Sequence, residues 1–352
     1  MIGTTVPAPD LGLGIDVGAS KIQLGVIDAE GAVLRRAHLS PWHYSKMEDN
    51  LANLMDRLDG LMGGYERHRF HDIGVGLPGT VDSVTGVVSY TPNLRWFDLP
   101  LGPMLTERTG LGVHLVQDTA AAAWGEYLYG AGQGLKNIAC ITIGSGVACG
   151  MVIGGELYGG ARHTAGEIGH LRVADESLVC GCGGRGCLEA GGSGLGLVKI
   201  FERNAKALGV EPRRFQDWPE EHPDEQLDQQ LYRQPEGQPK DRFNQGPNAH
   251  AIFEAAKRGD DLCLKSIAEM VENLALGLSV VATTLAPDAL ILSGGLSRER
   301  ELLIEPLMER TRAISYHTVV ENVRLAPAAL GADAPLVGAA ALYLSSEYGG
   351  AR

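Results

Sequence analysis

The sequence predicts an α/β fold built from two domains. Short β-prone segments alternate with longer helical patterns along most of the chain, which is typical of α/β proteins. A strand, a glycine turn and a second strand follow one another near residue 18, and the same unit recurs near residue 144. The length of 352 residues also favours two domains, because one domain commonly has about 150 residues.

The first expected domain begins with a hairpin. The segments LGLGIDV and KIQLGVID, within Leu11–Asp28, are both β-prone and are joined by the turn Gly18-Ala19-Ser20. Leu51–Leu61 has apolar residues three and four apart, which predicts an amphipathic helix. The other elements expected here are strands over Ala32–Leu39, Asp72–Leu77 and Val113–Val116 and a helix over Ala120–Tyr129.

The hairpin pattern returns in the segment IACITIGSGVACGMVI, Ile138–Ile153. A shift of 126 residues places Gly18 on Gly144 and Ile15 on Ile141, which favours two related halves, although any two glycine hairpins share such a pattern. The later elements expected are helices over Ala251–Gly259 and Leu262–Leu285, a strand over Ala289–Leu292, a helix from the turn Ser293-Gly294-Gly295 toward Arg312, and a final helix over Pro335–Leu344.

These elements suggest a domain division. We expect a small α/β domain over residues 1–118, completed by the C-terminal helix at about residues 335–352, and a large α/β domain over residues 119–334. Residues 212–248 are rich in Pro, Gln, Asp and Glu and carry only scattered apolar side chains, so we expect an exposed insertion there.

Composition excludes several classes of partner. The net charge of −13 argues against nucleic acid, whose binding needs a basic surface. No run approaches the ~18 to 20 apolar residues of a membrane span, and Met1–Asp10 lacks the pattern of a signal peptide, so we expect a cytoplasmic protein with no membrane partner. The 48 glycines are about twice the usual share and indicate tight turns and backbone that approaches a ligand.

One histidine and three cysteines form the strongest local signal. His170 is followed by Cys180, Cys182 and Cys187, and an imidazole with three thiolates suits tetrahedral Zn²⁺. Four protein ligands leave no position for a reactive water, so the predicted zinc is structural. The alternatives are ordinary cysteines in a glycine loop or a redox dithiol, but the segment contains no C-x-x-C pair.

The glycine turns suggest nucleotide binding. Backbone N–H groups in such turns can bind anions, and the first turn adds Asp16, which could hold hydrated Mg²⁺, and Lys21, which could contact phosphate. A third turn follows at Gly294-Gly295. The spacing is not that of a P-loop, and an ordinary hairpin remains the alternative for the first turn taken alone.

Three carboxylates stand in positions suited to a ligand. Glu167 and Glu189 flank the expected zinc loop and could, together with His170, bind hydroxyl groups, although solvated glutamates would fit the same positions. Asp118 ends a strand and precedes a helix, which fits either a helix N-cap or a carboxylate at the carboxyl edge of a sheet.

With these residues identified, the chain resembles the ROK family (repressor, open reading frame, kinase), and within it the sugar kinases. The resemblance extends from Leu11 to about Tyr343, and its most specific elements are GEIGH, ending at His170, and CGCGGRGCLE, Cys180–Glu189. It implies an actin/hexokinase-like (ribonuclease H-like) fold, with two α/β domains around a hinged cleft that binds ATP and a sugar.

The resemblance also implies roles for individual residues. The general base falls on Asp118 and the structural zinc on His170, Cys180, Cys182 and Cys187. ATP and Mg²⁺ contacts fall on Asp16, Gly18, Ala19, Ser20, Lys21, Gly144, Ser145, Gly146, Gly294 and Gly295, and substrate contacts on Gly79, Asn93, Gln117, Asp118, Glu167, His170 and Glu189.

Departures from the family pattern concern the substrate. The family usually has asparagine where Gln117 and Ala120 stand, and an extra methylene moves an amide enough to alter how hydroxyls are matched. Glucose is nevertheless the commonest substrate of the family, and Glu167 and Glu189 are present, so we expect an ATP-dependent kinase for the primary 6-type hydroxyl of glucose. The alternatives are a kinase for a related ring, such as a C7-cyclitol, an inositol or N-acetylmannosamine, and a sugar-binding sensor without catalysis.

Two further expectations come from the family. Its repressors carry an N-terminal helix-turn-helix module, whereas ten residues precede the first expected strand here, so we expect a kinase rather than a repressor. Its kinases suggest a homodimer or a homotetramer.

Overall fold

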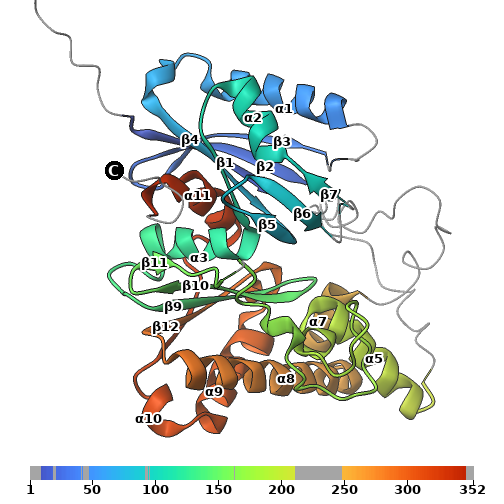
Figure 1. Cartoon of the computed structure of the whole chain (residues 1–352). Helices are drawn as coiled ribbons and strands as arrows, with labels where there is room; N and C mark the ends of the chain where they lie inside the picture. The colour runs from blue at the N-terminus through green and yellow to red at the C-terminus, as the bar shows by residue number, and fades with distance from the viewer. Residues whose placement is uncertain are drawn as a thin grey trace, which may run out of the picture. The chain divides into compact units, whose positions relative to one another are not determined.

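The computed structural model describes residues 9–18, 21–40, 42, 47–91, 94, 96–161, 163–210 and 248–345 (Figure 1). Contacts divide the chain into two compact units. Unit 1 contains Met1–Cys140, Gly150–Gly166 and Ala328–Arg352, and unit 2 contains Ile141–Cys149 and Glu167–Pro327.

Unit 1 is built on a five-stranded sheet. Its apolar strands β1 and β4 and the strand β8 run parallel, whereas β2 and β3 are antiparallel additions at one side. The carboxyl ends of the three parallel strands therefore meet at one edge, where α/β proteins commonly bind ligands. The strand order is β3 (Val33–Leu39), β2 (Ile22–Asp28), β1 (Leu11–Val17), β4 (Phe70–Leu77) and β8 (Val113–Gln117).

Helices cover both faces of this sheet, as Figure 1 shows: α1 and α2 lie on one side, and α3 and α11 on the other. Helix α1 buries Leu51, Leu54, Leu58 and Leu61 against the sheet, which is the apolar stripe that the sequence predicts. The helix bounds are α1 (Met47–Met62), α2 (Leu101–Thr109), α3 (Asp118–Tyr129) and α11 (Ala334–Ala340).

Glycines allow α11 to approach the sheet closely. A Cβ atom on Gly12, Gly14 or Gly74 would overlap a backbone carbonyl of α11. Helix α3 packs on the same helix, since a Cβ on Gly125 would lie 3.0 Å from the amide nitrogen of Gly338. The expected boundary at residue 118 therefore differs from the contact division, because it would separate α3 from the helix on which it packs.

A small antiparallel sheet in unit 1 was not expected. Its strands are β5 (Thr80–Asp82), β6 (Val87–Thr91) and β7 (Trp96–Leu99), in that order. Strands of three to five residues are too short to show a clear alternation of apolar and polar side chains.

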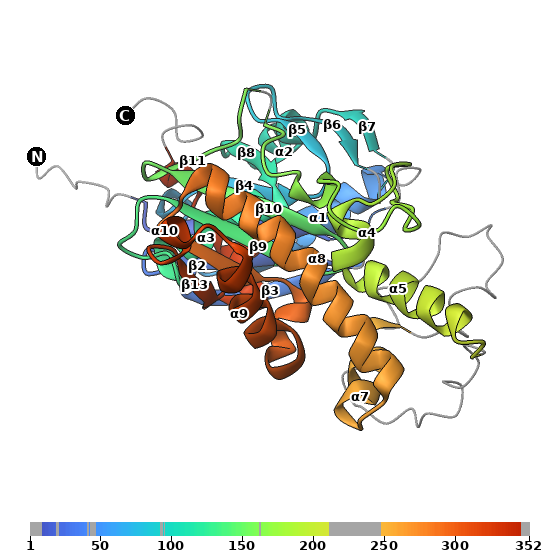
Figure 2. The same cartoon turned by 90° about the horizontal axis from the view of Figure 1, so that it is seen from below.

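The second sheet has the strand order β11-β10-β9-β12-β13. Helix α8 is the longest described helix and packs against α9 on one side and α5 and α7 on another (Figure 2). The bounds of this part are β9 (Ile138–Ile143), β10 (Val147–Ile153), β11 (Glu156–Leu157), α4 (Leu188–Gly192), α5 (Gly194–Ala207), α7 (Ala249–Lys257), α8 (Asp261–Leu285), β12 (Ala289–Ser293), α9 (Glu305–Ile314), α10 (His317–Val320) and β13 (Arg324–Pro327).

Helix α8 is long and apolar enough to cross a membrane by length and composition, the only such helix among the described residues. The expectation concerned an unbroken apolar run, and α8 does not contradict it, because Lys265, Glu269 and Glu272 interrupt the apolar residues of this helix. More than half of its most apolar window, 56%, is buried within the protein, which is typical of a core helix.

Two predicted helices are interrupted. Residues Gly295–Arg298 form a 3₁₀ turn and Arg300–Ile304 a π turn before α9 begins, because Pro306 has no N–H to donate to the preceding turn. The final helix α11 ends at Ala340, and a 3₁₀ turn over Leu342–Leu344 follows it. The insertion expected at residues 212–248 lies almost wholly outside the described residues.

Candidate functional site

The carboxyl edge of the unit 1 sheet brings two aspartates together. Asp16 lies near the end of β1, directly opposite Gly76 of β4, and a Cβ on Gly76 would lie 3.6 Å from the Cα atom of Asp118. Asp118 directly follows β8 as the first residue of α3. Two carboxylates, one near the end of β1 and one directly after β8, therefore share this edge.

The electrostatics of Asp16 reflect this placement. Burial, followed by the charge of Asp118, raises the pKa of Asp16 to about 7, while a hydrogen bond from Gln23 and the charge of Lys21 act in the opposite direction. A carboxylate that is costly to ionise gains most from a bound cation. The donor chemistry of Asp16 therefore fits a hydrated Mg²⁺, which prefers carboxylate oxygens.

The turn after Asp16 closes as predicted. The Gly18 N–H donates to the carbonyl oxygen of Lys21 at 2.9 Å, and β2 begins at Ile22. Ala19, Ser20 and Asn93, which the sequence also places in the site, lie outside the described residues.

Asp118 is not the N-cap residue of α3. The cap position belongs to Gln117, which makes no side-chain capping hydrogen bond, and Asp118 Oδ1 accepts from the Thr119 N–H at 2.7 Å. Gly79, in the turn after β4, has a φ of 101° and leaves no room for a side chain beside the Tyr90 carbonyl oxygen. Gly79 therefore holds this turn against β6 through its lack of a side chain.

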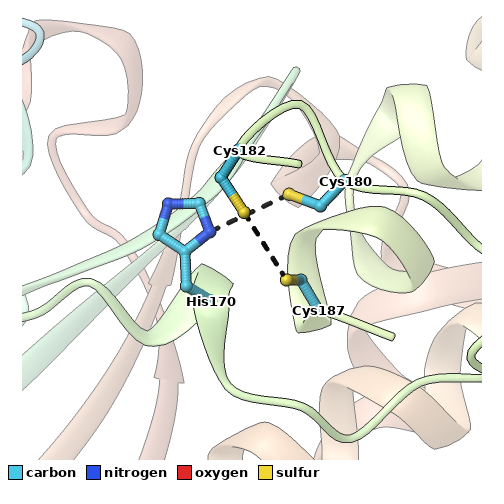
Figure 3. A group of neighbouring side chains, drawn as sticks. All are labelled: His170, Cys180, Cys182 and Cys187. Carbon is cyan, nitrogen blue, oxygen red and sulfur yellow. Dashed lines mark hydrogen bonds between the residues drawn. The ribbon is translucent and has the colours of Figure 1, made fainter. Parts of the chain in front are cut away.

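The four predicted zinc ligands come together in unit 2 (Figure 3). Their ligand atoms all lie within 4.8 Å of one another. Cys182 Sγ lies 3.8 Å from Cys187 Sγ, and Cys180 Sγ lies 3.8 Å from His170 Nδ1. A tetrahedral zinc with Zn–S distances of about 2.3 Å requires sulfur–sulfur separations of about 3.8 Å, so the donor set fits Zn²⁺.

Because His170 Nδ1 faces the sulfurs, its other nitrogen is directed elsewhere. His170 Nε2 lies 3.7 Å from Glu167 Oε2, and both side chains are more than 40% exposed. The pair thus presents an imidazole edge and a carboxylate to solvent, a combination that can donate to and accept from hydroxyl groups.

Glu189 connects the zinc loop with the second glycine turn. Its Oε2 accepts from the Val147 N–H at 3.3 Å, and its Oε1 lies 3.6 Å from Cys180 Sγ. Gly169 packs on the same strand, since any side chain there would overlap the Val147 carbonyl oxygen. The predicted carboxylate is therefore held between these two features.

Glycine turns from three segments of unit 2 also converge. The Gly144 N–H donates to the Gly146 carbonyl at 3.0 Å, and the Gly194 N–H donates to the Gly144 carbonyl at 2.8 Å. Gly294, with a φ of 93°, packs so closely on Ile143 that a Cβ atom would overlap its carbonyl oxygen. Ser145 and Gly295 complete the same two turns.

Sequence reasoning missed two contributors. Gly194 starts α5 and could have been suspected from the run GGSGLG, Gly191–Gly196. Gln23 donates to Asp16 and stands out as the one polar side chain within the strand segment IQLGVI.

A second group of potential metal ligands already has a cation. His250, Glu254 and Glu299 lie close enough to bind one ion. The Lys257 ammonium, however, lies 2.8 Å from Glu254 and 3.0 Å from Glu299, so this group is an ion-pair cluster.

The comparison with protein families decides the relationship. The model of the ROK family matches residues 12–346, nearly the whole chain. The chain belongs to the ROK family. A glucokinase from Streptomyces coelicolor is 32% identical over 339 residues, covering 94% of this chain and 97% of the relative.

Other members of the ROK family are similar to this chain in structure or in sequence. The ROK family glucokinase from Streptomyces griseus, solved with glucose and AMPPNP, is 33% identical, has a TM-score of 0.73 and covers 94% of this chain and 98% of that chain. A xylose repressor from Caldicellulosiruptor bescii is 26% identical and is covered over 78% of its length. The predicted α/β, actin/hexokinase-like fold class is confirmed, and the relatives support a sugar kinase within a family that also contains repressors.

Proposed function

We propose that this protein transfers the γ-phosphoryl group of ATP to the 6-hydroxyl of glucose. The observation that carries the proposal is the pair of carboxylates, Asp16 and Asp118, at the carboxyl edge of the unit 1 sheet in a chain that is similar to glucokinases. Phosphoryl transfer needs a proton acceptor and a site for the metal, and this edge offers both.

Asp118 acts as the general base. As the sugar oxygen forms its bond to the γ-phosphorus, the bond from that phosphorus to the bridging oxygen of ADP breaks, and the hydroxyl proton passes to the Asp118 carboxylate. Asp16 would hold the hydrated Mg²⁺, which when bound neutralises charge on the phosphates.

Backbone N–H groups bind the nucleotide. Glycine turns let phosphate oxygens approach the main chain, and Lys21 adds a positive charge near Asp16. The residues assigned to ATP are Gly18, Ala19, Ser20 and Lys21 from the first turn, Gly144, Ser145 and Gly146 from the second, and Gly294 and Gly295 on the adenosine side.

The hydroxyl groups of the sugar are recognised by polar side chains around a structural zinc. With zinc on Nδ1, His170 keeps Nε2 beside Glu167, so metal binding orients the imidazole. The residues assigned to the sugar are Gly79, Asn93, Gln117, Glu167, His170 and Glu189. We also propose a cytoplasmic homodimer or homotetramer, as the ROK kinases suggest.

A coupled assay of ADP release tests this function. Wild type and Asp118→Asn are compared with glucose, N-acetylmannosamine, a C7-cyclitol and inositol, and the product is mapped by phosphorus–proton coupling in NMR. We expect turnover with glucose, phosphate on its primary alcohol, and turnover about 10³-fold lower in the variant. If glucose binds but none of the tested rings causes release of ADP, the result would instead favour a sugar-binding sensor without catalysis.

Gln117→Asn tests the choice of ring. A site that hydrogen-bonds each hydroxyl discriminates strongly, so a shortened amide changes the ranking of kcat/KM if Gln117 contacts the substrate. We expect glucose to rank first in wild type. A cyclitol ranking first, with glucose gaining in Gln117→Asn, would make the cyclitol the native substrate.

A further inference from the structure

A chain of hydrogen bonds runs from the surface of unit 1 to Asp16. Gln23 lies directly opposite Asp16 across the β1–β2 pair, and its side chain is almost fully buried, at 4% exposure. Its Nε2 donates to Asp16 Oδ2 at 3.3 Å. The strand register itself therefore places an amide beside the carboxylate that we assign to the metal.

Arg36 fixes the orientation of that amide. Arg36 Nη1 donates to Gln23 Oε1 at 3.2 Å, and a guanidinium can only donate. Oε1 must therefore face Arg36, which leaves the NH₂ group of Gln23 to face Asp16. The amide orientation follows from its hydrogen-bond partners on both sides.

Asp333 holds Arg36 in turn. The carboxylate and the guanidinium form two parallel hydrogen bonds of 2.7 Å, from Nη1 to Oδ1 and from Nη2 to Oδ2. Such a bidentate pair fixes the plane of the guanidinium as well as its position. Asp333 comes from the C-terminal segment of unit 1, so residues far apart in the sequence support one side chain at the site.

We propose that Gln23, oriented by Arg36 and Asp333, is a positioning residue for the Mg²⁺ of the kinase reaction. By donating to Oδ2, Gln23 would fix the orientation of the Asp16 carboxylate that would hold the hydrated ion. The inference rests on the proposed function for its metal and nucleotide, but not on the identity of the sugar.

A neutral amide suits this role better than a charged side chain. A lysine at position 23 would neutralise Asp16 and compete with the metal, and a glutamate would add a third negative charge beside Asp16 and Asp118. An amide donates a hydrogen bond that fixes the carboxylate and leaves its charge for the cation. Groups that orient a metal ligand commonly contribute about 10- to 100-fold to metal affinity or activity.

The test compares Gln23→Met and Arg36→Met with Arg69→Met. Arg69 is the matched control, because it forms a similar two-bond pair with Asp10 in unit 1, of 2.9 and 2.5 Å, and has no part in the chain to Asp16. Calorimetry measures the affinity for AMPPNP with and without Mg²⁺. Steady-state assays measure the Mg²⁺ concentration for half-maximal turnover and the KM for glucose.

We expect Gln23→Met to lose about tenfold of the Mg²⁺-dependent gain in AMPPNP affinity and to need about tenfold more Mg²⁺ for turnover. Arg36→Met should have smaller effects: a loss of about threefold in the Mg²⁺-dependent gain in AMPPNP affinity, and a need for about threefold more Mg²⁺ for turnover. KM for glucose stays unchanged in both, and Arg69→Met behaves as wild type. Because Arg36 lies at the surface, its variant tests the chain of hydrogen bonds even if Gln23→Met folds poorly.

Wild-type Mg²⁺ dependence in both variants, with only a lower melting temperature, would overturn the inference and leave Gln23 a structural residue. Nucleotide affinity of wild type that does not respond to Mg²⁺ would overturn it as well. Failure of the proposed function looks different: Mg²⁺-dependent binding of AMPPNP is present in wild type, but no sugar is phosphorylated.

Discussion

Unit 1 and unit 2 hold their candidate site residues by different means. In unit 1, Asp16 and Asp118 belong to regular elements, a parallel strand and the first turn of α3. In unit 2, His170 and Glu189 border a segment with little regular structure, in which single bridges join Arg172 to Cys187 and Val179 to Arg185. The backbone fixes the first pair of residues, whereas the second region contains four side chains that could hold one metal ion.

This difference has a physical consequence. Regular backbone can hold two carboxylates close together, but it does not remove the free-energy cost of burying their negative charges. The ionised carboxylates are therefore expected to lower the stability of unit 1. If zinc binds the loop of unit 2 as proposed, the order of that loop should depend on the metal, because metal binding contributes to folding. The four predictions below test the two cases, beginning with the largest expected effect.

Asp118→Asn is expected to lower kcat by about 10³-fold, because an amide cannot accept the hydroxyl proton. Affinity for glucose, measured by calorimetry, should change little, since the amide keeps the size and much of the hydrogen bonding of the carboxylate. A kcat within tenfold of wild type would remove Asp118 from the role of general base.

Asp16→Asn is expected to lower kcat by about 10²-fold and yet to raise the melting temperature at pH 8 by several degrees. The pKa of Asp16 is raised from 3.8 to about 7 in the folded protein, so the folded state binds the proton more tightly than the unfolded state. Wild type therefore loses stability as the pH rises from about 4 to about 7, and the amide does not.

Melting curves of wild type and Asp16→Asn between pH 4 and pH 8 measure this effect. The difference in melting temperature should be small near pH 4, grow up to about pH 7 and stay constant above it. A difference that does not vary with pH would mean that Asp16 carries no charge penalty.

Zinc removal, or Cys182→Ser, is expected to lower the melting temperature by several degrees and to raise KM for glucose about tenfold, with KM for ATP nearly unchanged. His170 loses its orientation when the metal leaves, and its neighbour Glu167 loses a fixed partner. Metal analysis should find about one zinc per chain, and added zinc should restore the chelated wild type. Protein purified without zinc that has full glucose affinity would refute the metal site.

The smallest expected effect is a difference in KM for glucose between substitutions of Gly144 and Gly146, which lie in the same turn. A Cβ on Gly146 would lie 2.5 Å from Glu189 Oε2, whereas a Cβ on Gly144 meets no described atom within 4 Å. Gly146→Ala should therefore displace the Glu189 carboxylate and raise KM for glucose by a few-fold, while Gly144→Ala leaves that KM unchanged. Equal KM values for glucose in the two variants would show that Glu189 is not held by this contact.

Much of the fold could be predicted because its signals are local. The hairpin of β1 and β2, the stripe of leucines in α1 and the apolar strand β12 follow from periodicity and glycine turns within short windows. The candidate zinc ligands could also be identified from the sequence, because three of them lie within eight residues of one another. Their chemistry needs no knowledge of distant parts of the chain.

The features of the fold and the site that could not be predicted depend on contacts between residues far apart in the sequence. The turn after Gly294 was expected to open a single helix, but Pro306 forces a π turn before α9. The hydrogen bonds from Asp333 through Arg36 to Gln23 join two strands and the C-terminal segment. No local sequence pattern predicts them. The strands β5, β6 and β7 are short and gain their order from pairing with one another.

The packing of α11 determines when unit 1 can complete its fold during synthesis. As the chain leaves the ribosome, the strands of the unit 1 sheet emerge first, and Ala334–Ala340 emerges more than 200 residues after the last of them. Until then the backbone of Gly12, Gly14 and Gly74 has no helix to pack against, while every residue of unit 2 has already been made. Unit 1 therefore completes its core after unit 2 has been synthesised, and a nascent chain that stops before residue 334 contains all of unit 2 but leaves one face of the unit 1 sheet without α11.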